Sequence, residues 1–414
     1  MARNELYTGL DIGSSTIRVV VGQRHPTDEG LQILGAAEGP AEGISKGTIT
    51  SIEDAVSSIS ATLEKVERMT GVPVEHAAVS INGVHVVSQD SHGIVAVAKA
   101  DGEIKQNDVD RVIEAAQSVA TPPNYEILHV VPRSFTVDNQ HGVKDPIGMS
   151  GMRLEVDAQV IQGLTAQIKN LQKAVYRTKV DIDDMVLAVL ASSLACVSKR
   201  QKELGVAVVN IGSSTTSLMV FEEGDVMHTK ILPVGASHIT NDIAIGLRIS
   251  IDLAEKVKLE YGTALPDDVQ KRDDVNLGDV GGEAAMVSRR HIAEIIQARV
   301  EEIFSMVDRE LQHVDRSGLL PAGIILTGGG AKLPGLTDVG KKEFRLPVGI
   351  GWPQGYTSAV DKIQDPAFTT ALGLASWTAE THEGGPSFTK NIPGTSAVTD
   401  TVENIRRWVK GFIP

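Results

Sequence analysis

Two segments of the chain, one at its start and one near its middle, resemble each other. Residues 6–23 read LYTGLDIGSSTIRVVVGQ, and residues 205–224 read GVAVVNIGSSTTSLMVFEEG. Each is an apolar, β-rich run followed by IGSST and a second β-rich run. The spacing leaves room only for a turn, so each segment predicts a hairpin with a polar, glycine-containing tip. Two such hairpins indicate a duplicated architecture with one tip in each half.

A third glycine cluster lies at PAGIILTGGGAKLPGL (321–336), where a strand precedes the glycines and a helix is expected after Pro334. Helical and strand periodicities alternate between these markers. Helices are predicted over 52–71, 107–120, 165–179, 249–262 and 288–314, and a polar, acidic loop over 265–283. The residues from 93 to 161 form a separate block of strand, helix and further strands. The pattern predicts an α/β protein with a self-contained block in its first half.

The first tip, DIGSS at 11–15, places a carboxylate and a row of small residues at the end of a strand. Small residues let consecutive backbone N–H groups turn toward an anion, and serine hydroxyls add donors, so phosphate is the ligand that fits. Because Asp11 and a phosphate repel each other, a divalent cation between them is expected. Most glycine-serine turns bind nothing, but two matching tips and the TGGG cluster together favour a nucleotide site.

The second tip has Asn210 where the first has Asp11. An amide carries no charge, so it holds a metal or its waters more weakly and polarises an attacking water poorly. We therefore expect nucleotide binding with slow or absent hydrolysis. The signatures of other nucleotide and metal sites are missing, since the sequence contains no GxxxxGK[ST], no GxGxxG after a strand and no HExxH.

The stretch AEKVKLEYG places Glu255 and Lys258 three residues apart on one helical face. One interpretation is a solvated ion pair, which describes most such pairs. The other is that the two side chains hold the ribose hydroxyls of a nucleotide whose phosphates lie on the tips.

Composition excludes several classes of function. The formal net charge of −14 argues against a general nucleic-acid binder, because phosphate backbones require a basic surface. A single cysteine, Cys196, excludes a disulfide framework and thiolate zinc sites. The first residues lack an apolar segment of signal-peptide length, and the chain has no apolar run of about 18 residues. These features predict a soluble, cytoplasmic protein.

The sequence ends with TVENIRRWVKGFIP, residues 401–414, after a stretch rich in glycine, proline, serine and threonine that predicts a flexible tether. Wound as a helix at about 100° per residue, the ending gathers its apolar side chains within roughly 140°. The predicted membrane-contacting residues, apolar and basic, are Val402, Ile405, Arg406, Arg407, Trp408, Val409, Lys410, Phe412 and Ile413. A terminal helix docked on its own domain would not need the tether, so a helix in the membrane surface is favoured.

The motifs GLDIGSST, VVNIGSSTT, AEKVKLEYG and TGGGAKLPG, in this order and spacing, resemble those of the actin-like ATPase superfamily. Within it the chain is similar to the FtsA family of bacterial cell-division proteins. The family-specific stretches are HTKILPVGASHITNDIA (228–244), LHVVPRSFTVD (128–138), DPIGMSGMRLEV (145–156), DPAFTTALGLA (365–375) and the ending. The resemblance extends from about residue 6 to the end of the chain.

The resemblance implies an actin-like duplicated α/β fold, with two lobes of two subdomains each around a nucleotide cleft and a C-terminal amphipathic helix. The implied boundaries are 1–85 with 166–195 and 360–378 for subdomain IA, 86–165 for an inserted subdomain IC, 196–240 with 305–359 for IIA, 241–304 for IIB, 379–400 for a linker and 401–414 for the membrane helix.

The resemblance also implies ATP and Mg²⁺ as cofactors, with the metal held at Asp11 through water. The residues assigned to nucleotide binding by the matching motifs are Asp11, Gly13, Ser14, Ser15, Arg18, Asn210, Gly212, Ser213, Ser214, Thr215, Gly235, Glu255, Lys258, Gly328, Gly329 and Gly330. The second loop of the superfamily usually reads Asp-Ile-Gly-Gly-Gly, from which Asn210, Ser213 and Ser214 depart. Relatives often carry a lysine near the position of Thr16, where the nearest cation here is Arg18. These departures weaken the case for hydrolysis more than the case for binding.

The function implied is to tether FtsZ filaments to the cytoplasmic membrane by nucleotide-dependent self-assembly. The implied partners are the C-terminal peptide of FtsZ, the inner leaflet of the membrane, further copies of the chain, and other division proteins at residues 86–165. Arg290 and Arg299 resemble the basic contacts for the FtsZ peptide, although two solvated helix arginines would look the same. A pilus-assembly relative and a sugar kinase of the same superfamily are the alternatives.

Overall fold

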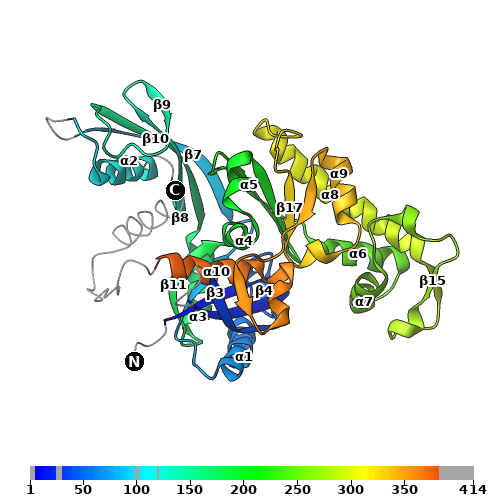
Figure 1. Ribbon diagram of the computed structural model, residues 1–414. Helices are drawn as coiled ribbons and strands as arrows, with labels where there is room; N and C mark the ends of the chain where they lie inside the picture. The colour runs from blue at the N-terminus through cyan, green and yellow to red at the C-terminus, as the bar shows by residue number, and fades with distance from the viewer. Residues whose placement is uncertain (1–4, 25–29, 98–101, 119–120, 382–414) are drawn as a thin grey trace.

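The structure is a computed structural model that describes residues 5–24, 30–97, 102–118 and 121–381. Two large sheets and a smaller, projecting sheet organise this part of the chain (Figure 1). Among the described helices, none has the length and apolar character needed to cross a bilayer. The predicted membrane helix lies outside the described residues, as does the predicted linker from residue 382 onward.

The first large sheet has the strand order β11-β6-β1-β2-β3-β19. Its strands are β1 (Leu6–Ile12), β2 (Thr16–Arg24), β3 (Leu31–Pro40), β6 (His76–Ile81), β11 (Asp181–Leu187) and β19 (Tyr356–Ser358). Its helices are α1 (Ile52–Thr70), α3 (Thr165–Tyr176), α4 (Ala188–Cys196) and α10 (Thr369–Thr381), and β4 (Ile44–Ser45) pairs with β5 (Thr48–Ile49) beside them. We call this unit the first lobe.

Alternation along β2 shows why both faces of this sheet are covered. Val20 packs in a cluster with residues of α10, whereas Val19 and Val21 pack in the cluster that contains residues of α1. Successive side chains of a strand point to opposite faces, so a run without polar residues needs a helix layer on each side. The crossing of α10 over α4 is close, because a Cβ on Gly373 would lie 1.8 Å from the carbonyl oxygen of Ala191.

The second large sheet has the strand order β14-β13-β12-β17-β18. Its strands are β12 (Val206–Ile211), β13 (Thr216–Glu222), β14 (Asp225–Leu232), β17 (Ile324–Thr327) and β18 (Val348–Ile350). Its helices are α5 (Lys199–Leu204), α6 (Ala236–Leu247), α7 (Ile251–Tyr261), α8 (Arg289–His313) and α9 (Leu336–Phe344), with a two-stranded ribbon of β15 (Asp274–Asn276) and β16 (Met286–Ser288). We call this unit the second lobe.

The two large sheets share one topology. In the first, β1 pairs antiparallel with β2 and β2 with β3, while β6 and β11 add in parallel on the other side of β1. In the second, β12, β13 and β14 are antiparallel, and β17 and β18 add in parallel beside β12. The duplication predicted from the two hairpins is therefore confirmed.

A smaller sheet is inserted between β6 and α3. It has the order β7-β10-β8-β9, with strands β7 (Val86–Ala96), β8 (Tyr125–Val137), β9 (Gln140–Val143) and β10 (Arg153–Leu164) and one helix, α2 (Gln106–Ser118). It has its own apolar core, and α2 covers one of its faces. This unit, called the inserted sheet below, projects from the first lobe in Figure 1.

Helix ends follow the chemistry of the sequence. Ser51 caps α1 by accepting from the N–H of Asp54, and Gly71 ends it in a left-handed conformation with φ of 70°. The five predicted helices are all present.

The structure differs from the sequence predictions at three points. The predicted loop 265–283 contains β15 and two 3₁₀ turns, Pro266–Asp268 and Leu277–Val280, because β16 supplies a partner strand that the sequence alone does not identify. β19 lies before the predicted boundary at residue 360 yet pairs with β3 of the first sheet. α10 continues to Thr381, past the predicted start of the linker at residue 379.

Candidate functional site

A cleft of about 640 Å³ lies between the two lobes, at the ends of the hairpins. All the residues predicted to bind nucleotide line it, except Gly235. Its other lining residues are Ile12, Thr16, Gly47, Asn82, Ala188, Ala236, Ser237, Ile239, Leu259, Lys332, Leu333, Pro334, Ala367 and Thr370. Fold duplication thus brings together three glycine-containing loops that are far apart in the sequence.

The two tips have the same local geometry. The N–H of Gly13 donates to the carbonyl of Thr16 at 3.2 Å, and the N–H of Gly212 donates to that of Thr215 at 2.9 Å. In both hairpins the strands stay in register up to the tip, pairing Ile12 with Ile17 in the first and residues 211 and 216 in the second. The serines between therefore project from short turns into the cleft.

Asp11 is the carboxylate of the first tip. Burial raises its pKa, while the charge of Arg18 and a hydrogen bond with the Ser80 side chain lower it. Arg18 lies opposite Asp11 in the strand register, 3.4 Å from Glu38, with its guanidinium 5.5 Å from the centre of the Phe368 ring. The Arg18 Nε has no hydrogen-bond partner among the described atoms. The cleft floor thus combines a desolvated carboxyl with a cation.

Asn210 is held by hydroxyl groups rather than left open to solvent. Its Nδ2 donates to Ser192 Oγ at 3.1 Å and to Thr370 Oγ1 at 3.2 Å. Gly328 lies against the same side chain, since a Cβ there would be 2.4 Å from Asn210 Oδ1. The third glycine cluster consequently approaches the second tip as closely as backbone allows, which a larger residue at 328 would prevent.

Gly235 supports the second tip from behind instead of lining the cleft. A Cβ on Gly235 would lie 2.6 Å from the carbonyl oxygens of both Gly212 and Ser213. The next two backbone N–H groups, of Ala236 and Ser237, donate to these same carbonyls at 2.9 and 2.8 Å. The start of α6 is therefore fastened to the second tip, and the contact of Gly235 with a nucleotide stays a prediction.

Glu255 and Lys258 form a partly buried network rather than a solvated ion pair. Lys258 is 8% exposed, and its Nζ lies 2.6 Å from Glu255 Oε2 and 2.8 Å from Thr240 Oγ1. The Thr240 hydroxyl also donates to Glu255 Oε2 at 2.5 Å. Both charged side chains reach the cleft, on the wall formed by α6 and α7.

Among the cleft residues that the sequence analysis missed, Gly47, Asn82 and Thr370 make hydrogen bonds to the tips. Gly47 lies in the turn between β4 and β5, and its N–H donates to Ser14 Oγ at 3.0 Å. Asn82 follows β6, and Thr370 lies in the first turn of α10. A polar residue just after a predicted strand is a usable signal for Asn82, because parallel strands end at the same sheet edge. The sequence does not reveal that β6 lies beside β1.

The two predicted FtsZ contacts lie on α8 and are already paired. Arg290 Nη2 lies 2.9 Å from Asp267, whose side chain is 90% exposed. Arg299 makes a bidentate pair with Asp242 of α6, at 2.5 and 2.9 Å, and this hydrogen bonding raises the pKa of its guanidinium. Arg290 is thus held by a surface pair, whereas Arg299 fastens α8 to α6.

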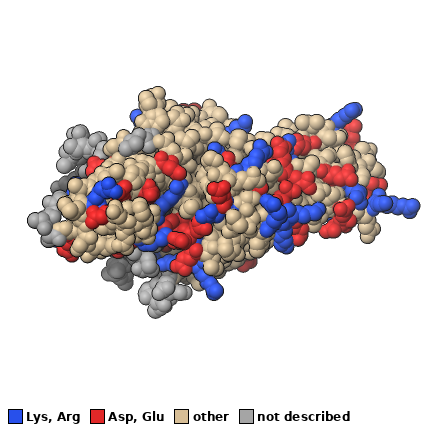
Figure 2. All heavy atoms as spheres, turned by 90° about the horizontal axis from the view of Figure 1, so that it is seen from above, with Lys and Arg blue, Asp and Glu red and all other residues tan. Residues whose placement is uncertain are grey.

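Charges on the face drawn in Figure 2 are mixed, with basic and acidic side chains interspersed across it. Among the described residues, no group of three or more His, Cys, Asp or Glu side chains is placed to hold a metal ion. The predicted membrane residues from Val402 to Ile413 lie outside the described ranges.

Two family models match the chain. One, described as cell division protein FtsA, matches residues 207–373, and the other, described as the SHS2 domain inserted in FtsA, matches residues 83–162. The cell division protein FtsA of Pseudomonas aeruginosa is 35% identical over 413 residues, covering 98% of each chain. That of Bacillus subtilis is 38% identical over 375 residues, covering 90% of this chain and 83% of its own. That of Escherichia coli K12 is 31% identical over 414 residues and 98% of each chain.

Solved structures with the same fold are more distant in sequence. A PilM–PilN type IV pilus biogenesis complex has a TM-score of 0.66 at 16% identity, covering 89% of this chain and 97% of that one. MreB5 of Spiroplasma citri bound to ADP has a TM-score of 0.56 at 12% identity, covering 92% of this chain and 99% of that one. The described part of the chain therefore has the actin-like fold.

Proposed function

The chain belongs to the FtsA family of cell-division proteins, and from that premise we propose that its cleft binds ATP with Mg²⁺ and that nucleotide governs its assembly on the membrane. The observation that carries the proposal is the convergence of both glycine-serine tips and the Gly328–Gly330 cluster on one cleft between the lobes. Backbone N–H groups and hydroxyls at such turns suit phosphate oxygens.

The residues present fit a metal–nucleotide complex. The Asp11 carboxylate has its charged form disfavoured by burial, and a divalent cation beside it would reverse that effect. The bound cation would neutralise the repulsion between the carboxylate and the phosphates. Glu255 and Lys258 offer an acceptor and a donor on the opposite wall, where ribose hydroxyls would bind. Because Asn210 lacks a charge, we infer slow hydrolysis at most.

The test is a titration of the full chain with a fluorescent ATP analogue, with and without Mg²⁺. We expect Asp11→Asn to weaken Mg²⁺-dependent binding about tenfold or more, because one charge-assisted contact of roughly 1.5–3 kcal/mol is lost. Asp338→Asn is the matched control, since Asp338 lies on α9 and does not line the cleft. Equal affinities for the two variants, or Mg²⁺-independent binding by the parent chain, would contradict the proposed site.

We further propose that the second lobe holds the C-terminal peptide of FtsZ near Arg290, that the C-terminal segment 401–414 holds the inner leaflet of the membrane, and that protomers assemble with one another. Membership of the family supports all three. Other division proteins would contact the inserted sheet.

The two alternatives are less well supported. The pilus-assembly alternative rests on a likeness of fold at 16% identity, against 31–38% identity over most of the chain to FtsA relatives. A sugar kinase would turn over substrate, so robust phosphate transfer to a panel of sugars would favour that alternative over the adaptor function.

A further inference from the structure

The inserted sheet touches both lobes, although it branches from only one. It leaves the first lobe after β6 and returns to it where β10 runs into α3. Its strands β7, β8 and β10 also lie against β14, the edge strand of the second sheet. A unit attached to one lobe and packed on the other must respond when the lobes move relative to each other.

Three side chains of the inserted sheet bind the second lobe, mostly through its backbone. Ser88 Oγ donates to the carbonyl of Thr229 at 2.6 Å. The Arg133 guanidinium donates to the carbonyls of Val226 at 3.3 Å and Met227 at 2.5 Å. Lys144 pairs with Asp225 and donates to the carbonyl of Glu223 at 3.2 Å. We call Ser88, Arg133 and Lys144 the bridging residues.

The bridging residues bind a strand that is connected to the cleft. β14 pairs with β13, which begins directly after the second tip. Side chains that bind carbonyls along β14 follow that strand wherever it moves, because backbone groups in a sheet move together.

The root of the inserted sheet is also connected to the cleft, through Asn82. Its Nδ2 donates to Thr215 Oγ1 at 3.1 Å, and its Oδ1 accepts from Ser217 Oγ at 3.0 Å. The turn that contains Gly47, whose N–H bonds Ser14 of the first tip, packs closely against Asn82. A Cβ on Gly47 would lie 2.3 Å from the Asn82 carbonyl oxygen. Gly83 follows with φ of 133°, and β7 begins three residues later. The residue from which the inserted sheet departs is therefore bonded to the second tip directly and connected to the first tip through the Gly47 turn.

We propose that the inserted sheet is a strut between the lobes, so that closure of the cleft on its ligand changes the position of the inserted sheet relative to the first lobe. The part of this inference that concerns the ligand rests on the proposed function. Its consequence is that a surface far from the cleft reports whether the cleft is occupied.

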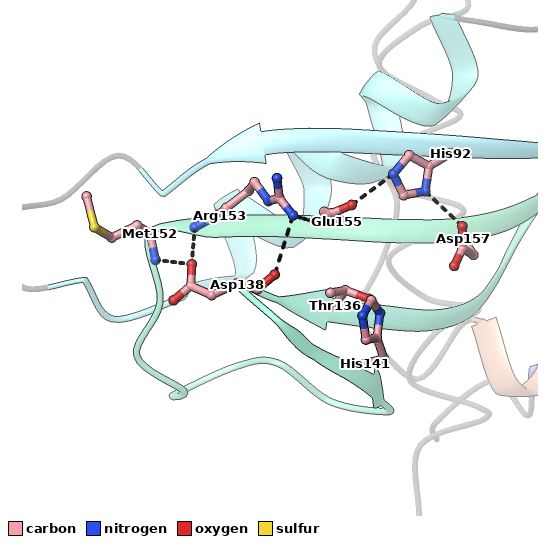
Figure 3. Close-up of polar contacts among 8 residues, drawn as sticks. All are labelled: His92, Thr136, Asp138, His141, Met152, Arg153, Glu155 and Asp157. Atoms are coloured by element: carbon pink, nitrogen blue, oxygen red, sulfur yellow. Dashed lines mark hydrogen bonds and ion pairs between the residues drawn. The ribbon is translucent and has the colours of Figure 1, made fainter.

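The test compares two triple variants by amide hydrogen exchange on the full chain. The strut variant, Ser88→Ala/Arg133→Met/Lys144→Met, removes the bridging residues. The control variant, Ser118→Ala/Arg111→Met/Arg153→Met, also removes one hydroxyl and two cations from the inserted sheet. Its side chains bond within that unit: Ser118 to Glu114, Arg111 to Asp108 and the Ala96 carbonyl, and Arg153 to Glu155 and Asp138. Figure 3 shows Arg153 beside Glu155 and Asp138, on the strand that also carries Asp157, the partner of His92.

Without ligand, we expect faster exchange across β14 and β7 in the strut variant than in the control variant. With ATP and Mg²⁺, we expect protection of both tips in all three proteins. Altered exchange in β8 and β10 should then appear in the parent chain and the control variant and be lost from the strut variant.

The two proposals fail in different ways. Unprotected tips would contradict nucleotide binding, while the comparison without ligand still decides the strut. Equal exchange of the two variants without ligand would overturn the strut, as would a ligand response of the inserted sheet that survives in the strut variant. Protected tips with no response of the inserted sheet in the parent chain would overturn it too.

Discussion

Asn210 and Asp11 occupy equivalent places in the two tips, but their surroundings differ. Asp11 faces Arg18 across a strand pair, whereas Asn210 donates to the hydroxyls of Ser192 and Thr370. Replacing Asn210 with aspartate would preserve the shape of the side chain but remove both hydrogen bonds that Nδ2 donates. The hydroxyls would have to rotate to donate instead, and that of Ser192 is now directed to the Ala188 carbonyl at 2.8 Å.

We expect Asn210→Asp to raise the rate of phosphate release from ATP, because a second carboxylate in the cleft can hold metal-bound water and polarise it. Steady-state phosphate release, with nucleotide binding measured in parallel, tests this. Asn170→Asp on α3, which does not line the cleft, is the matched control. An unchanged rate with intact binding would show that residue 210 does not limit hydrolysis.

His129 is a neutral histidine that joins the inserted sheet to the first lobe. Its Nε2 accepts the N–H of Leu187 at 3.1 Å, and its ring meets that of Trp377 edge-on at 6.0 Å. Burial lowers its pKa from 6.5 to about 4. Between pH 6.5 and about pH 4, His129 binds a proton in the unfolded chain but not in the folded one. Its contribution to stability is therefore fully present above the pKa of the unfolded chain and is lost as the pH falls toward the pKa of the folded chain.

As the pH falls from 7.5 to 5, protonation of this histidine in the unfolded chain should lower the free energy of unfolding by about 2 kcal/mol. His129→Gln retains an acceptor without the titration, so its stability should fall less steeply with acid. Denaturant unfolding at the two pH values measures the difference. His76→Gln, at a side chain that is 61% exposed, should behave like the parent chain. A His129→Gln variant as acid-sensitive as the parent would contradict this assignment.

At the scale of elements, α8 explains why two arginines of one helix have different roles. Arg299 is 23% exposed and is locked by Asp242 of α6. Arg290 instead pairs with Asp267 and Glu294, whose side chains are 90% and 52% exposed. Exposed ion pairs contribute little, about 0–1 kcal/mol, so Arg290 can exchange Asp267 for a carboxylate of a partner at low cost. Releasing Arg299 would disconnect two helices.

We therefore expect Arg290→Met to weaken binding of the FtsZ C-terminal peptide roughly tenfold, in line with loss of one charge-assisted contact. Arg299→Met should lower the thermal midpoint as well as the affinity. Fluorescence anisotropy of a labelled peptide measures binding. Arg309→Met, on the same helix with its side chain bonded to the Ser305 carbonyl, is the control. Full affinity in the Arg290 variant would remove this residue from the proposed interface.

At the scale of the whole molecule, we expect the affinity of a single chain for the membrane to be low. A 14-residue helix is marginal in water and should fold only on a lipid surface. The net charge of −14 opposes contact with anionic lipid. Alignment of many copies in an assembly would multiply the small affinity of each through effective concentration.

Co-sedimentation with anionic vesicles tests this coupling. The full chain should pellet more with ATP than without, roughly tenfold or more, and a chain ending at Asp400 should stay in solution in both conditions. Trp408→Glu should release the protein while nucleotide binding persists, whereas Trp352→Glu, at a tryptophan that is 54% exposed, should not. Vesicle binding that survives Trp408→Glu would refute the predicted membrane helix.

The sequence by itself determined the two hairpins, the glycine cluster and the long helices, because each depends on neighbours within one turn or one helical face. The matching tips also predicted the duplication, and all but one of the residues assigned to nucleotide binding line the cleft. These features depend on residues that are close together in the sequence.

Tertiary structure alone decided which distant groups meet. Asn82 bonds Thr215 across 133 positions, and Arg133 bonds the Met227 carbonyl across 94. Strand order placed Asn82 beside the tips. The packing of α6 placed Gly235 against the second tip and Asp242 within reach of Arg299. A hydrogen bond to a backbone carbonyl leaves no signature in the residue that supplies it. The roles of Asn82 and of the bridging residues therefore became visible only in the folded chain.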